Sequence, residues 1–265
     1  MSENQAERAE QADAAVLGRK VFFLYPHSVM QEQLMELIFH AGYEVYFLRD
    51  HAKAMRVLPE YPGSLLFVNV DERIKDTTWE LYVASLMQNP KTQSLRIGVL
   101  SYNSDQNLRK KFLMELAVPC GFVQLKLGLA ESARILLSVL EANEARGKRK
   151  FVRVIMPDDS VVSFSVKQDN SYITGHIRDL SIAGMACSLL NGSRFANGDV
   201  LPDLQLNLRG TIVRTSGKVV GSREAEDGTS YVVMFTSEAS ETRRKLHFFI
   251  YATLQAQLDK RIAAL

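Results

Sequence analysis

The stretch Leu65-Leu66-Phe67-Val68-Asn69-Val70, followed by Asp71, decides the fold of the first half of the chain. It is an almost continuous apolar run without alternation, which is typical of a strand buried on both faces of a parallel sheet. Similar runs occupy residues 21–25, 45–48, 97–100 and 121–125. Together the five runs predict the strands of one parallel sheet.

Helical patterns separate these runs. Apolar residues recur every three or four positions in residues 31–41, 106–117 and 130–143. Strands that alternate with helices predict a small, doubly wound α/β domain, which we place at residues 19–144. Residues 1–18 are acidic and rich in Ala, and they lack the apolar core of a signal peptide. We expect them to form a disordered or helical tail.

After residue 148 the pattern changes to short runs with turn residues between them. Such runs fill residues 151–156, 161–166, 172–177, 184–190, 204–208, 211–220 and 231–235. Short strands at this spacing predict a small antiparallel β-barrel. Residues 240–265 follow with an apolar stripe at the helical period, which predicts a C-terminal helix. We expect the stripe to pack on the barrel or on a partner, and a membrane-lying helix is the alternative. The second domain is thus expected at residues 145–265.

Composition excludes several classes of protein. The 265 residues are 46% hydrophobic and 23% charged, as in ordinary globular proteins. Thirty-two Lys and Arg against 30 Asp and Glu leave a net charge of +2, so nucleic-acid binding is not indicated and an anion site must be a local cluster. Two Cys are too few for a disulfide framework or a thiolate zinc site. The sequence contains no run of 18 apolar residues, which is the length that would predict a membrane span. We expect a cytoplasmic protein. The five His are scattered singly, so no enzyme is expected.

A basic junction joins the two halves. It reads Arg146-Gly147-Lys148-Arg149-Lys150-Phe151-Val152-Arg153, in which five of eight residues are cationic and none is acidic. About 26 residues later, between two predicted strands, stands Asp179-Leu180-Ser181-Ile182-Ala183-Gly184. Taken alone, the first stretch is consistent with a solvated linker. In the second, Asp179 and Ser181 could cap a turn, and Gly184 could be a bulge glycine.

Taken together, the two stretches resemble the PilZ domain. Arg149 and Arg153 match its Arg-x-x-x-Arg pair, and Asp179, Ser181 and Gly184 match its Asp-x-Ser-x-x-Gly motif, so the resemblance covers residues 146–251. It implies a barrel that binds cyclic di-GMP and catalyses no reaction, without a cofactor or metal. An α/β domain before such a barrel is similar to two-domain PilZ proteins of spirochaetes and to flagellar-brake proteins. That similarity implies a signal passed by domain rearrangement to an unidentified protein partner in motility or attachment.

The chemistry of these residues suits the implied ligand, which carries two phosphates and two guanines. The planar Arg fork matches phosphate oxygens or the O6 and N7 edge of guanine. The Asp179 carboxylate can accept from guanine N1–H and N2–H, and Ser181 offers a hydroxyl donor. Gly184 lacks a Cβ, so backbone can approach the ligand closely. Lys148 and Lys150 flank Arg149 and are further candidate phosphate contacts.

The first half resembles a response-regulator receiver domain in the order of its elements. Asp71, Ser101 and Lys126 follow the third, fourth and fifth predicted strands and match that family's phosphate acceptor, hydroxyl and lysine positions. After the first strand, however, the chain reads Tyr25-Pro26-His27-Ser28, with no carboxylate to hold a divalent cation. We therefore expect a pseudo-receiver that makes contacts. A phosphorylation-controlled regulator that uses Asp71 is the alternative function.

Overall fold

A computed structural model describes residues 18–27, 35–125, 129–157, 161–168, 171–190, 193–225, 228–236 and 239–265. The chain divides into two compact units. The first runs to Lys150 and includes Gln255–Leu265, and the second is Phe151–Leu254. The expected N-terminal tail, except for Gly18, and the first four residues of the helix predicted at 31–41 lie outside the described residues.

The first unit is built on a five-stranded parallel sheet. Its strands are β1 (Val21–Leu24), β2 (Val45–Leu48), β3 (Leu65–Asn69), β4 (Arg96–Ser101) and β5 (Phe122–Gln124). Their order is β2-β1-β3-β4-β5, with every neighbouring pair parallel. This is the order of flavodoxin-like doubly wound folds. Every residue of β1, β2 and β3 is buried, which explains their continuous apolar sequences. The predicted receiver-like architecture is confirmed.

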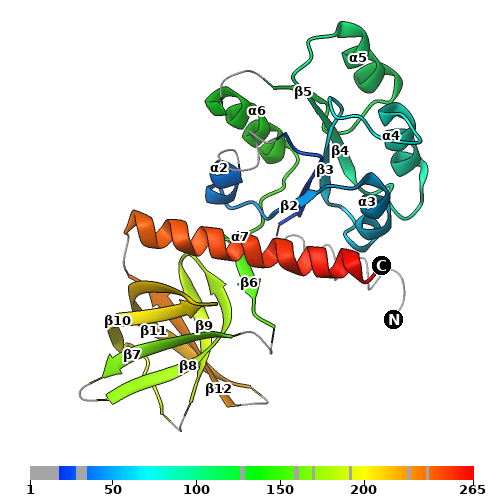
Figure 1. Cartoon of the computed structure of the whole chain (residues 1–265). Helices are drawn as coiled ribbons and strands as arrows, with labels where there is room; N and C mark the ends of the chain where they lie inside the picture. Colours follow the sequence, from blue (N-terminus) through cyan, green and yellow to red (C-terminus); the bar gives the residue numbers. More distant parts are fainter. Residues whose placement is uncertain are drawn as a thin grey trace. The chain divides into compact units, whose positions relative to one another are not determined.

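Helices cover both faces of this sheet. In Figure 1, α2 (Met35–His40) and α6 (Leu129–Ala142) lie on one side, and α3 (His51–Val57), α4 (Trp79–Gln88) and α5 (Gln106–Lys110) lie on the other. Asp50 and Thr78 cap α3 and α4 by accepting from backbone N–H groups in the first turn of each helix.

The helix prediction was wrong in two respects. Neither α3 nor α4 is among the predicted elements, although the buried residues of α4 follow a helical period: Trp79, Tyr82, Val83 and Leu86. The helix predicted at 106–117 is interrupted, because α5 ends at Lys110 and a π-helical turn, Lys111–Glu115, follows it. A π-turn keeps a near-helical spacing of apolar side chains, so sequence periodicity does not distinguish it from an α-helix.

The second unit is a closed antiparallel barrel. Its strands are β7 (Val162–Gln168), β8 (Ser171–Ser181), β9 (Gly184–Leu189), β10 (Val200–Leu208), β11 (Thr211–Ala225) and β12 (Gly228–Phe235). Pairing runs in the order β8-β7-β10-β11-β12-β9, and β9 pairs back to β8, which closes the barrel. The short strand β6 (Arg153–Ile155) pairs with the last part of β8 (Figure 1). The predicted antiparallel barrel is confirmed.

Two barrel strands run further than the predicted runs. β8 continues through Asp179 to Ser181, which the sequence places between strands, because this part of β8 pairs with β6 and with β9. β11 continues from the predicted end at residue 220 to Ala225, because it stays paired with β12 up to Gly228. In both places non-local ladder pairing outweighs the local turn preference.

The last helix, α7 (Ser240–Ala263), confirms the predicted C-terminal helix and contributes to both units. Leu246, Ile250 and Leu254 are buried residues of the barrel unit. In the first unit, the Gln255 side chain accepts from Phe47 N at 2.8 Å and donates to Phe47 O at 2.9 Å. Since β2 is the edge strand of its sheet, this amide occupies backbone groups that an edge leaves open. Among the helices described, none has the length and apolar character needed to cross a bilayer.

Candidate functional site

The Asp-x-Ser-x-x-Gly segment forms the tight hairpin between β8 and β9. Asp179 and Ser181 end β8, Gly184 opens β9, and the ladder pairs Ser181 with Gly184. A Cβ on Gly184 would lie 2.3 Å from Val233 O and 3.1 Å from Met234 Cα, so β12 approaches this position closely. Glycine is therefore needed here for packing between strands, as a side chain would push β12 away.

The Ser181 hydroxyl serves the hairpin itself. It is buried, donates to Gly184 O at 3.1 Å and accepts from Ala183 N at 3.3 Å. These contacts agree with the turn-forming alternative for this residue. A contact between Ser181 and a ligand stays a prediction.

Arg153 and Asp179 meet at the start of the barrel. The pairing of β6 with β8 places Arg153 opposite Ser181, and Ile155 opposite Asp179. Arg153 Nη1 lies 3.1 Å from Asp179 Oδ1 and donates to Oδ2 at 3.3 Å. The side chains are 40% and 17% exposed, respectively, and a partly exposed ion pair of this kind stabilises a fold only slightly. Either side chain can therefore leave this ion pair and bind a ligand instead, and the fold loses little stability.

The remaining predicted site residues precede the barrel. Lys148, Arg149 and Lys150 are exposed and end the main segment of the first unit, whereas Arg153, Asp179, Ser181 and Gly184 belong to the second unit. The structure brings the last four together at one hairpin. Contact of the first three with a ligand on the barrel stays a prediction.

Neither cysteine is a candidate nucleophile. Burial raises the pKa of Cys120 to about 11 and that of Cys187 to about 12, so both thiols stay protonated at neutral pH. Within the described ranges, no three His, Cys, Asp or Glu side chains are grouped so as to hold a metal ion.

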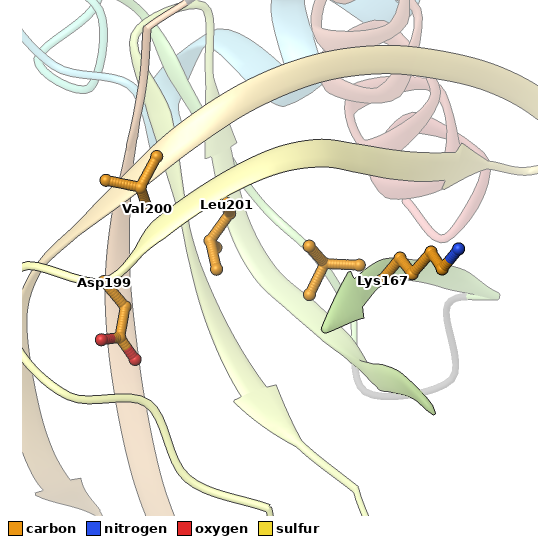
Figure 2. Close-up of a pocket in the computed structure, with 5 residues that line it drawn as sticks. Lys167, Asp199, Val200 and Leu201 are labelled. Carbon is orange, nitrogen blue, oxygen red and sulfur yellow. The ribbon is translucent and has the colours of Figure 1, made fainter. Parts of the chain in front are cut away.

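A small pocket lies between β7 and the start of β10. Figure 2 shows its lining, which consists of Val166, Lys167, Asp199, Val200 and Leu201. The pocket encloses about 110 Å³, whereas sites for small molecules usually enclose about 300–1,000 Å³. Asp199 Oδ2 already accepts from Ala196 N at 2.8 Å. The pocket is therefore too small for a nucleotide, and an open surface of the barrel is the better candidate.

In the first unit, Asp71 is an exposed residue whose carboxylate has three protein partners. Its Oδ1 accepts from Ser101 Oγ at 2.5 Å, its Oδ2 accepts from Tyr102 N at 2.7 Å, and His27 Nε2 lies 3.2 Å from Oδ2. The structure thus brings Asp71 and Ser101 together as predicted, and it adds His27 from the segment after β1. Lys126, the third predicted residue of this site, lies outside the described residues.

Fold and motifs together define a class of two-unit proteins. In this class a receiver-like unit precedes an antiparallel barrel, and an Arg–Asp ion pair joins the first strand of the barrel unit to its β-hairpin. The family model described as PilZ domain matches residues 147–252. This part of the chain is therefore a PilZ domain, and the predicted resemblance is confirmed.

Several solved structures are similar to parts of the chain. The PilZ domain of YcgR from Escherichia coli, solved with c-di-GMP, has 16% identity and a TM-score of 0.40, over 44% of this chain and 99% of that one. MotI/DgrA, an inhibitor of motility of Bacillus subtilis, has 19% identity and a TM-score of 0.35, over 43% of this chain and 52% of that one. The chemotaxis response regulator CheY4 of Vibrio cholerae has 16% identity and a TM-score of 0.38, over 46% of this chain and 99% of that one. No curated protein matches the chain.

Proposed function

We propose that this chain is a receptor for cyclic di-GMP that catalyses no reaction. The observation that carries the proposal is the Arg153–Asp179 pair beside the β8–β9 hairpin, within a segment that matches the PilZ domain. The guanidinium fork and the carboxylate are both partly open to solvent, and each has the hydrogen-bonding pattern that one part of the ligand needs.

Each group has a separate role in ligand binding. Arg153 binds a phosphate or the O6 and N7 edge of a guanine, where bidentate Arg contacts are favourable. Asp179 faces a guanine and accepts from its N1–H and N2–H groups. It does not face a phosphate, since two negative charges repel each other. Its Oδ1 is covered by protein and lies 3.1 Å from Arg153 Nη1, so Arg153 must turn from the carboxylate to the ligand before Oδ1 can take a new donor. Gly184 keeps β12 close to the hairpin and offers the ligand its backbone. Ser181 holds the hairpin, and its hydroxyl donates to the ligand once it gives up its hydrogen bond to Gly184 O.

Arg149, Lys148 and Lys150 complete the site from the other unit. They add positive charge opposite a ligand with two phosphates, and they lie at most five residues before Arg153 in sequence. A ligand held by Arg149 and by the barrel ties one unit to the other. We infer that binding rearranges the two units and that the new arrangement is read by a protein partner, with motility or attachment as the process controlled.

Calorimetric titration of the full chain with cyclic di-GMP tests the proposal. Wild type should bind it in preference to GTP, GMP and cyclic di-AMP, because Asp179 selects guanine. Arg153→Ala and Arg149→Ala should each weaken binding about ten- to more than a hundredfold, since a hydrogen bond to a charged group contributes roughly 1.5–3 kcal/mol.

Arg214→Ala is the matched control, because Arg214 is an exposed arginine on β11, away from the hairpin. It should bind like wild type. Equal binding of cyclic di-AMP, or normal binding by folded Arg153→Ala, would contradict the proposed roles.

A further inference from the structure

A row of paired residues leads from the β8–β9 hairpin across the outer wall of the barrel. The strand registers pair Arg153 with Ser181, Ser181 with Gly184, Gly184 with Met234, Met234 with Lys218, and Lys218 with Val200. The row thus begins at the proposed ligand site and crosses β9 and β12 to reach β11 and β10. Neighbouring strands are about 4.8 Å apart, so Lys218 Cα lies roughly 10 Å from Gly184 Cα.

The side chains beyond Gly184 in this row face outward. Met234 is 50% exposed and Lys218 is exposed, whereas the next residues along their strands, Val233 and Val219, are buried in the core. Because side chains alternate across a strand, Met234 and Lys218 lie on the outer face of the wall. Arg153 is exposed on β6 and its neighbour Val154 is buried, so Arg153 faces outward too.

The two cations of this row differ in their ionic partners. Arg153 is paired with Asp179, whereas no carboxylate in the described ranges forms an ion pair with Lys218. The surface beside Lys218 is apolar, since Met234, Val220 and Val232 are all partly exposed there. Lys218 is therefore a cation without a described ionic partner, set in an apolar surface two strands from the hairpin.

We propose that the cyclic dinucleotide site extends along this row, with Met234 against the face of a guanine and Lys218 on a phosphate. The inference rests on the proposed function and adds two residues that lie outside both motifs. The ligand has two phosphates and two bases, and the hairpin with Arg153 offers partners mainly for one end. Gly184 has no side chain, so no side chain at this position stands between the hairpin and Met234. An apolar thioether packs well on an aromatic ring, and an ammonium group is a compact partner for a phosphate.

Titration of Lys218 variants of the full chain with cyclic di-GMP tests the phosphate contact. Lys218→Met should weaken binding about tenfold or more, which is the loss typical of a hydrogen bond between charged groups. Lys218→Arg should keep most of the affinity, because it keeps the charge. Arg214→Met is the control, since it removes the same charge from the same face of β11, four residues away. Unchanged binding by Lys218→Met, or an equal loss in Arg214→Met, would overturn the assignment.

A second pair of variants tests the base contact. Met234→Leu should bind nearly as wild type, because it preserves an apolar side chain of similar volume. Met234→Glu should weaken binding more than tenfold, because it places a carboxylate beside the phosphates. If wild type does not bind cyclic di-GMP, the proposed function itself fails. If wild type binds and Arg153→Ala does not, but the Lys218 and Met234 variants all bind normally, only the extension along the row is wrong.

Discussion

At the scale of single residues, Asp71 has the position of a phosphate acceptor but different surroundings. A receiver that transfers phosphate needs its acceptor carboxylate accessible beside a divalent cation. Here one oxygen of Asp71 accepts from Ser101, and the other accepts from Tyr102 N and lies 3.2 Å from the His27 ring. The first-strand segment brings an imidazole to this carboxylate, where the receiver pattern would place acidic side chains.

We therefore expect no phosphorylation of Asp71. Incubation with acetyl phosphate and Mg²⁺ should give no phosphoryl adduct by intact-mass spectrometry, because Tyr25-Pro26-His27-Ser28 after β1 contains no carboxylate to hold the Mg²⁺ ion beside Asp71. Asp71→Asn should give the same spectrum as wild type. A phosphorylatable response regulator treated in parallel is the positive control. An adduct on wild type that Asp71→Asn lacks would support the alternative function, a phosphorylation-controlled regulator.

At the scale of elements, α7 contributes a stripe of buried apolar side chains to the barrel unit. Ile250 is fully buried, and Leu246 and Leu254 lie one turn away on either side, on the same stripe. The helix is fixed at its start by Thr242 Oγ1, which donates to Arg214 O at 3.1 Å. Its apolar stripe is thus buried within the fold, which favours packing on the protein over the membrane-lying alternative for this helix.

Ile250→Ala should lower the free energy of unfolding by about 2–5 kcal/mol, the usual cost of a cavity left by a large aliphatic side chain. Phe248→Ala is the matched control on the same helix, because Phe248 is 73% exposed. It should change stability by no more than about 0.5 kcal/mol. Urea unfolding followed by circular dichroism measures both. Equal effects of the two variants would mean that the buried stripe of α7 does not stabilise the barrel.

At the scale of the whole molecule, the chain passes between its two units twice, at Lys150–Phe151 and within α7 at Leu254–Gln255. The first passage separates Arg149 from Arg153, the two arginines that we propose to bind one ligand. A ligand can shift the arrangement of the units only by its difference in affinity for the alternatives. The bridging that we propose, by Arg149 and the barrel, would supply such a difference.

Saturating cyclic di-GMP should therefore change the distance distribution between spin labels on the two units. Lys110→Cys on α5 and Thr211→Cys on β11 are suitable sites, because both positions are exposed. The buried native thiols have raised pKa values and should react slowly with the label. In Arg153→Ala the ligand should cause no change. An identical distribution with and without ligand in the parent protein would show that the units do not rearrange.

Sequence alone determined the two fold classes and the motif residues. Continuous apolar runs mark strands buried on both faces, as in β1 and β3, and short runs between turn residues mark the barrel strands. Such signals are local, so they can be read without the fold. The Arg-x-x-x-Arg and Asp-x-Ser-x-x-Gly residues are also visible in sequence, because the donors and acceptors of a side chain are fixed by its residue type.

Only the tertiary structure decided which of these residues meet. The Arg153–Asp179 pair and the extension of β8 through Ser181 depend on the pairing of β6 with β8. Gly184 and Met234 stand fifty positions apart in sequence, yet closure of the barrel makes them ladder partners, and Lys218 follows on the next strand. Register between distant strands depends on how the whole barrel buries its core, and no local pattern encodes it.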